Sequence, residues 1–278
     1  FAGNLTPIIL IAGACGITAG DELQVAILQN AMLVAGIVTL VQLFTIGPVG
    51  ARLPVVMGTS SGFIGVCRSV AGVMGGGVVA YGAILGASIV GGLFEGVLGM
   101  FLKPLRKFFP SVVTGTVVLS IGLSLISVGI NSFGGGSGVK DFGSLENLFL
   151  GTVVLVTIVV LKHKCKGFAS SSAILIGVII GYIVAAIMGF ILPHTFMFTD
   201  AAAGTTAELT KSWVLNWDKV ASAPWISIPK LLPVPLVFDA RAIIPIGIMF
   251  IVTAVETVGD LSGITEGGLG REATDKEL

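Results

Sequence analysis

Two acidic side chains near the C-terminal end, Glu256 and Asp260, directly follow the apolar run Ile243–Val255. This run spans roughly 20 Å as a helix, whereas the hydrocarbon core of a bilayer is about 30 Å thick. We therefore expect the helix to continue past Val255 and to carry both carboxylates into the membrane, on one face because they are four residues apart. The alternative is a helix that ends at Val255, with both acids among the lipid headgroups. Because an acid inside a bilayer must face a cavity, a partner or a substrate path, the pattern favours a polar functional site.

The composition places the chain among membrane proteins. Charged residues make up 11% and hydrophobic residues 54% of the sequence, and the mean hydropathy is +1.04, values that a soluble domain does not reach. The formal net charge of zero argues against a nucleic-acid-binding surface. Cys15, Cys67 and Cys165 are too few and too scattered for a disulfide framework or a zinc site. Cys15 and Cys67 lie in apolar runs and are expected to be small core residues.

The apolar runs predict about eight membrane segments and an all-α polytopic fold. Gly82 with Gly86, and Gly92 with Gly96, give the fourth segment a face of small residues for close packing. In chain order, the segments are Leu5–Ile17, Val25–Ile46, a broken third region over Leu53–Met74, Val78–Leu102, Val112–Ile130, Leu148–Leu161, Ala173–Leu192 and the helix that carries Glu256.

The third region is expected to be a broken helix rather than a plain span. Pro54 and the polar stretch 58–62 (Gly-Thr-Ser-Ser-Gly) interrupt its apolar sequence and free backbone groups at membrane depth. Such backbone is tolerated where it lines a cavity, and in transporters it points to the binding site. The alternative is a loop between two ordinary helices, but Phe63–Met74 is too short to span a bilayer and carries Arg68.

Two further charges lie in apolar surroundings, Arg68 in the third region and Glu95 in the fourth segment. We expect them to form a structural ion pair across two helices, because charges inside a membrane generally pair; the alternative is a role in transport. The sequence contains no P-loop, no dinucleotide-binding glycine fingerprint, no GxSxG elbow and no HExxH motif. The chain is therefore expected to be neither an enzyme nor an ATPase, and to hold no cofactor or metal.

Basic residues predict the orientation of the segments. If every region crosses the membrane once, nine lysines and arginines fall on one side, and the positive-inside rule makes that side cytoplasmic. The polar interval 193–240, which contains all three tryptophans (Trp213, Trp217 and Trp225), is then an extracellular or interfacial segment with aromatic anchors. The nine basic residues are Arg52, Lys103, Arg106, Lys107, Lys162, Lys164, Lys166, Arg271 and Lys276.

Three stretches of the sequence together resemble the nucleobase–ascorbate transporter family, which includes xanthine, uric acid and uracil permeases. They are 35–42 (AGIVTLVQ), 53–60 (LPVVMGTS) and 255–260 (VETVGD), and the resemblance covers essentially the whole chain. Members of that family have fourteen segments in two inverted repeats of seven, and a short strand and half-helix in segment three meet the substrate. The resemblance implies that residues 1–104 are core segments one to four, 105–193 gate segments five to seven, 194–240 the connection, and 241–278 segment eight.

The resemblance also implies the site, residue by residue. Glu256 matches the segment-eight glutamate that hydrogen-bonds the ring nitrogens of the base. Asp260 matches an aspartate of the purine branch, where bacterial uracil permeases carry histidine. Many members have Ser-Phe where this chain has Ser60-Ser61, so the nearest ring for stacking is Phe63. The implied substrate-binding residues are Glu256, Gly58, Thr59, Ser60, Ser61 and Phe63, with Asp260 in coupling or support.

The implied function is import of a xanthine- or urate-like purine by proton symport, with sodium as the coupling ion in some relatives. A uracil permease, and an anion exchanger or channel of the related inverted-repeat fold, stay as alternatives, although a buried Glu256 would repel an anion. The expected location is the inner cell membrane, where lipid surrounds the protein. A homodimer is one expected assembly, although the sequence does not decide between it and a monomer. The chain begins in an apolar run at Phe1, so we expect a piece of a longer protein, with one repeat plus one helix of the second.

The orientation can be tested with single cysteines at positions 106 and 213 of the full-length protein, after the native cysteines are replaced. A membrane-impermeant thiol reagent added outside should label position 213 and leave position 106 unlabelled, because the basic loop is expected to be cytoplasmic. Strong labelling at 106 with none at 213 would reverse the predicted orientation.

Overall fold

The structure is a computed structural model and describes residues 2–18, 21–47, 49–100, 111–136, 139–200, 205–224, 227, 229–274 and 277. Within these residues, six helices are long and apolar enough to cross a membrane, and two shorter apolar helices lie at Gly3–Ala14 and Phe63–Val73. These eight helices correspond to the eight segments expected from the sequence. The prediction of an all-α polytopic membrane protein is therefore confirmed.

The chain divides into two compact units, residues 1–124 with 228–278, and residues 125–227. The helix α6 (Ser111–Phe133) begins in the first unit and ends in the second. The other helices of the first unit are α1 (Ala2–Ala14), α2 (Glu22–Phe44), α3 (Phe63–Val73), α4 (Gly77–Met100) and α11 (Ala240–Leu269).

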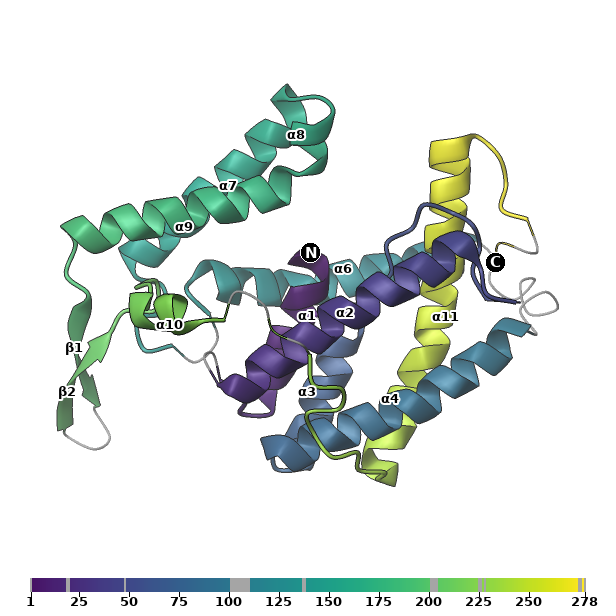
Figure 1. Cartoon of the computed structure of the whole chain (residues 1–278), viewed down its shortest axis with the longest axis horizontal. Helices are drawn as coiled ribbons and strands as arrows, with labels where there is room; N and C mark the ends of the chain where they lie inside the picture. The colour runs from purple at the N-terminus through teal and green to yellow at the C-terminus, as the bar shows by residue number, and fades with distance from the viewer. Residues whose placement is uncertain are drawn as a thin grey trace. The chain divides into compact units, whose positions relative to one another are not determined.

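An apolar core holds the helices of the first unit together. In this unit α11 packs against α4 and α3, and α1 packs against α2 and α3 (Figure 1). Ile246 of α11 is fully buried in this core, and Cys15 and Cys67 are buried beside it. The expectation that both cysteines are small core residues is confirmed. Leu40 and Phe44 of α2 are exposed, as apolar side chains can be where lipid surrounds them.

Two glycines of α4 make room for the extended segment that leads into α11. A Cβ atom at Gly82 would overlap the carbonyl oxygen of Pro235, and one at Gly86 would overlap that of Val237. The Val237 amide also donates to the Gly82 carbonyl at 3.1 Å. The expected face of small residues therefore exists, but at Gly82 and Gly86 it receives extended backbone rather than a second helix. A Cβ atom at Gly96 would meet nothing within 4 Å.

The helices α4 and α11 run in the same direction where they meet. The ring of Phe250 covers Gly91, and Thr253, three residues further along α11, reaches Glu95 on α4. In the predicted orientation α4 and α11 both enter the membrane from outside, so they must run in the same direction, as they do. The orientation itself stays a prediction. Among the residues on which that prediction rests, Lys103, Arg106, Lys107, Lys276 and Trp225 lie outside the described residues.

The third region is broken, as expected. Its helix α3 begins only at Phe63, and residues 53–62 form neither helix nor strand. The short strand implied by the resemblance is therefore not formed by this part of the chain. A strand needs a neighbouring ladder of backbone groups, whereas side chains of α1 and α2 meet the backbone here, as described below.

The second unit is built on the helices α7 (Leu145–Lys164) and α9 (Ala173–Ile191), which pack antiparallel. A Cβ atom at Gly177 would meet Ile158, and one at Gly181 would meet Val154, so these glycines set the close approach. Trp217 is exposed, as an interfacial anchor would be, whereas Trp213 is buried in the protein. The elements are α7 (Leu145–Lys164), α8 (Phe168–Ser171), α9 (Ala173–Ile191), the antiparallel strands β1 (Thr195–Asp200) and β2 (Thr205–Thr210), and α10 (Trp217–Ser222).

A matched pair of alanine substitutions tests the glycine contact of α4 in the full-length protein. Gly86→Ala should lower the thermal stability of the purified protein by about 1–3 kcal/mol, because the new Cβ overlaps the Val237 carbonyl and the packed backbone must shift. Gly96→Ala adds the same atom on the same helix where space is open and should be neutral or slightly stabilising. Equal stability of the two variants would contradict the packing.

Candidate functional site

A hydrogen bond joins the broken third region to the acidic helix. The Ser60 hydroxyl donates to Oε2 of Glu256 at 3.0 Å, across 196 positions of sequence. Both side chains are half-buried. The sequence-based expectation that Glu256 and the polar break form one site thus has a direct contact behind it.

The helix that carries Glu256 continues well past Val255. It runs from Ala240 to Leu269, so Glu256 lies about 24 Å along a helix about 45 Å long. The alternative of a helix that ends at Val255 is therefore wrong. Asp260 lies one turn beyond Glu256 and is exposed.

An acidic N-cap fixes the start of α11. The Asp239 carboxylate accepts hydrogen bonds from the Arg241 amide at 2.8 Å and from the Arg241 guanidinium at 2.8 and 3.1 Å. These bonds lower the pKa of Asp239 to about 2, so the cap stays charged at neutral pH. A charged acceptor at the N-terminus also suits the helix dipole and stabilises the first turn.

Side chains of α1 and α2 hold the irregular backbone of the third region. The Thr59 amide donates to Oδ1 of Asn4 at 2.8 Å, and the Met57 amide donates to the Thr39 hydroxyl at 3.0 Å. Asn4 in turn donates through Nδ2 to the Ala31 carbonyl at 3.2 Å, which ties α1 to α2 as well. Two alternate amides of the break are thereby satisfied from one side.

The other edge of the same backbone is open. Among the described residues, the amides of Val56, Gly58 and Ser60 have no hydrogen-bond partner. Gly58 is exposed, and a Cβ atom there would come within 3.3 Å of Asn4 Oδ1 on the tethered side. The break therefore leaves three backbone N–H donors unpaired within the described part of the chain, and one of them belongs to Ser60, whose hydroxyl contacts the Glu256 carboxylate.

Phe63 has a packing contact in the structure. Its ring lies 4.8 Å from that of Phe250 at an angle of 59°, so it links α3 to α11. Of the other residues named from the sequence, Ser60 contacts Glu256, and Gly58 and Thr59 lie beside Asn4. Ser61 lies in the turn that begins α3, where its carbonyl accepts from the Ile64 amide at 3.2 Å.

The expected ion pair between Arg68 and Glu95 is not formed. Arg68 is exposed, and Oε1 of Glu95 instead accepts from the Thr253 hydroxyl at 3.1 Å. Proximity along the sequence did not show which way each side chain points around its helix. Thr253, Asn4 and Thr39 were missed as site residues, although each is a polar side chain within an apolar run, which is the signal that could have found them.

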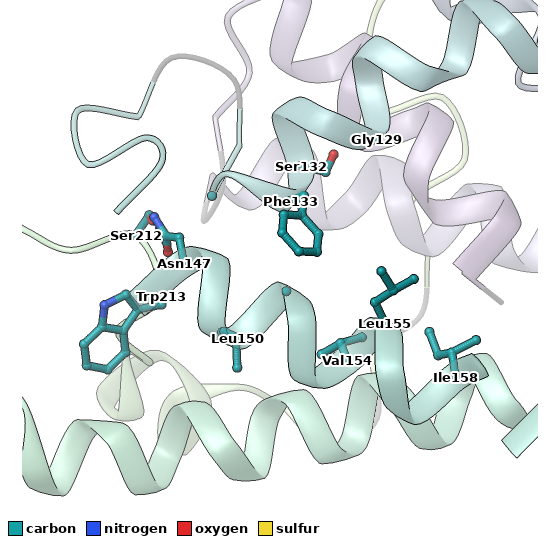
Figure 2. A pocket seen from close by; sticks show the side chains of 12 residues that line it. Gly129, Ser132, Phe133, Asn147, Leu150, Val154, Leu155, Ile158, Ser212 and Trp213 are labelled. Atoms are coloured by element: carbon teal, nitrogen blue, oxygen red, sulfur yellow. Dashed lines mark hydrogen bonds between the residues drawn. The ribbon is translucent and has the colours of Figure 1, made fainter. Parts of the chain in front are cut away.

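A cavity of about 490 Å³ is lined entirely by residues of the second unit. Figure 2 shows Phe133 of α6 facing the side chains of α7, with Asn147, Ser212 and Trp213 gathered at one end. Ser212 is already hydrogen-bonded within this unit, since Asp141 accepts from the Ser212 amide at 2.8 Å and hydroxyl at 2.9 Å, whereas the buried Nε1 of Trp213 has no hydrogen-bond partner among the described residues. Because no acidic or basic side chain lines the cavity, we do not include it in the candidate site.

Comparison with known proteins identifies the family. A family model described as a permease family matches residues 4–271. The chain belongs to this permease family. The match confirms the resemblance to nucleobase–ascorbate transporters, in the purine branch, and these permeases are transporters rather than enzymes.

Three relatives show how much of the family this permease chain represents. A Clostridium perfringens protein that carries the name of a purine permease is 36% identical, over 96% of this chain and 52% of that protein. The uric acid permeases PucJ and PucK of Bacillus subtilis are 34% and 32% identical; each alignment covers 100% of this chain, and 56% and 57% of those proteins. The permease chain thus spans about half the length of the curated relatives it matches.

The tether of the broken region gives a testable expectation. Asn4→Leu in the full-length permease should destabilise the protein by about 1–3 kcal/mol, because the Thr59 amide loses its acceptor where little water can replace it. Thr39→Val should act in the same direction through Met57, whereas Thr39→Ser keeps a hydroxyl and is the tolerated control. Thermal unfolding in detergent measures this, and parent-like stability of Asn4→Leu would show that the tether does not hold the break.

Proposed function

We propose that the complete protein is a secondary active transporter that imports a xanthine- or urate-like purine across the inner cell membrane by proton symport. The observation that carries this proposal is the contact between Ser60 of the broken region and Glu256 of α11. In the proposed site the Glu256 carboxylate and the unpaired amides of Gly58 and Ser60 bind the substrate together, and the Ser60–Glu256 contact supports this arrangement. Membership of the permease family and the printed names of the purine and uric acid permeases support the substrate class.

The chemistry of an oxidised purine suits these groups. Its ring N–H groups can donate to a carboxylate, and its carbonyl oxygens can accept from N–H and hydroxyl donors. In the proposed complex Glu256 accepts from the ring through Oε1, the oxygen that Ser60 does not occupy. The amides of Gly58 and Ser60 donate to the purine carbonyls, while Phe63 packs against Phe250 and shapes the site from behind. Both binding elements belong to the proposed core domain, residues 1–104 and 241–278.

Proton coupling is proposed to use the carboxylates of α11. Asp260 lies one helical turn beyond Glu256, near enough for the two charges to interact. When two carboxylates lie this close, the state in which the pair carries one proton is favoured over the state in which both are ionised. In the proposed cycle the core domain moves as a rigid body against a gate domain that includes residues 105–193, and the second inverted repeat completes both domains.

An anion exchanger is the weaker alternative. The N-terminus of α3 begins at Phe63, beside Ser60, and a helix N-terminus favours negative charge. Glu256 reaches the same place and would repel an anion there. A neutral base such as xanthine avoids this repulsion, whereas urate, an anion at neutral pH, would need to bind together with a proton. Uracil is the pyrimidine competitor to be included in every binding experiment.

The central test is Glu256→Gln in the full-length protein. The substitution keeps the volume of the side chain but removes a charge-assisted hydrogen bond, so the affinity for xanthine or urate should fall about ten- to a hundredfold. Asp260→Asn should impair proton-driven uptake more than binding. Equilibrium binding and uptake into proteoliposomes, each with a proton gradient or a sodium gradient, are the measurements.

Glu266→Gln is the matched control, because Glu266 is an exposed acid further along the same helix and should tolerate the change. If Glu256→Gln binds and transports purines like the parent, the site assignment is wrong. Uptake of uracil but not xanthine or urate by the parent would favour the uracil alternative, and chloride-dependent exchange would favour the anion exchanger.

A further inference from the structure

Glu95 is an acid that the proposed binding mode does not use. It is the only charged residue in the sequence of α4 and lies half-buried near the C-terminal end of that helix. Its Oε1 accepts from the Thr253 hydroxyl of α11 at 3.1 Å. Glu95 therefore touches α11 three residues before Glu256.

The Thr253 hydroxyl has two competing acceptors. Besides Glu95, the carbonyl oxygen of Phe250 in the preceding turn lies 3.1 Å from Thr253 Oγ1. A hydroxyl has one proton to donate, so it can bond fully either across to α4 or back into α11. Thr253 is buried, and little water is available to relieve this competition.

We propose that Glu95 is a second protonatable carboxylate of the transport cycle, and that its proton decides which of the two acceptors the Thr253 hydroxyl serves. As a carboxylate, Glu95 accepts from Thr253 across the interface. When it takes one proton from water, the neutral acid becomes the donor to Thr253 Oγ1, and the threonine hydroxyl turns to the Phe250 carbonyl. The proton is the only species gained, and the local charge rises by one. This inference rests on the proposed function and adds a proton carrier on α4 to it.

The charges around Glu95 favour a role for the proton. α4 packs against α11 and α3. From α11, Glu256 lies about one helical turn beyond Thr253, the residue that Glu95 contacts. From α3, Arg68 is exposed, and no ion pair joins it to Glu95 among the described residues. Two neighbouring acids without a paired cation repel each other, and one proton relieves that repulsion.

A division of labour between the two acids follows. Glu256 stays free to accept from the base, while Glu95 takes up the proton on the neighbouring helix. Protonation of Glu95 on α4 changes the acceptor of the Thr253 hydroxyl on α11. The protonation of α4 thereby alters a hydrogen bond of the helix that carries Glu256. The effect needs no movement larger than a hydroxyl rotation at this point.

The experiment uses the full-length permease in proteoliposomes with three substitutions. Glu95→Gln removes the titrating group, Thr253→Val removes the hydroxyl while keeping the shape, and Thr253→Ser restores the hydroxyl. The control is Ser88→Ala on α4, because among the described residues the Ser88 hydroxyl bonds the Ile84 carbonyl of its own helix and does not reach α11. The readouts are the infrared C=O band of protonated carboxylic acids against pH, xanthine or urate binding, exchange without a gradient, and gradient-driven uptake.

Glu95→Gln should remove one titrating carboxylic-acid band and reduce uptake driven by a proton gradient about tenfold or more, while binding and exchange stay within a few-fold of the parent. Thr253→Val should shift that band and the pH at which it disappears, and Thr253→Ser should restore both. Ser88→Ala should match the parent in every readout.

The inference is overturned if Glu95→Gln leaves the infrared titration unchanged, or if gradient-driven uptake by that variant keeps the parental proton dependence. A Thr253→Val variant with the parental band would also overturn it. Failure of the parent to bind any purine would instead defeat the proposed function. The infrared titration needs no substrate and would still decide whether Glu95 and Thr253 share a proton.

Discussion

The first unit depends on how ten residues of irregular backbone, 53–62, are held among helices. In a bilayer a free amide or carbonyl costs several kcal/mol unless it finds a partner within the protein. Asn4 of α1 supplies that partner to Thr59, and Thr39 of α2 supplies it to Met57. The two hydrogen bonds fall on alternate residues, and the amide of Gly58 between them stays unpaired within the described part of the chain. The same constraint therefore stabilises the break and produces its open edge.

The position of Glu256 is set by contacts far from it in the sequence. Gly82 and Gly86 let the extended segment before α11 lie directly on α4, and the Asp239 cap starts the helix at that point. Phe250 over Gly91 then fixes how α11 passes α4. Given this start and this crossing, a side chain sixteen residues into the helix arrives opposite Ser60. The small residues of α4 thus matter to the site although none of them touches it.

The sequence predicted the elements better than it predicted their partners. The length of the Glu256 helix followed from bilayer thickness, and the break followed from Pro54 and the polar stretch after it, because both depend on local composition. The pairing of Arg68 with Glu95 was wrong because it depends on the rotation of two helices about their axes. Asn4 could have been found by asking which group satisfies each polar side chain in an apolar run. The choice of Thr59 as its partner could not, since it depends on how α1 packs against the break.

The acids around α11 also bear on what kind of coupling is possible. Glu95 contacts α11 at Thr253, and Glu256 and Asp260 follow on that helix within two turns. A neutral purine adds no charge when it binds, so it cannot balance these acids as a cationic substrate would. Only a proton or another cation can change their net charge during the cycle. If proton binding raises the affinity for the base by some factor, the base must raise the affinity for the proton by the same factor. Glu256 of α11, which contacts the base in the proposal, and Glu95 of α4, which takes up the proton, would meet that requirement across two adjacent helices.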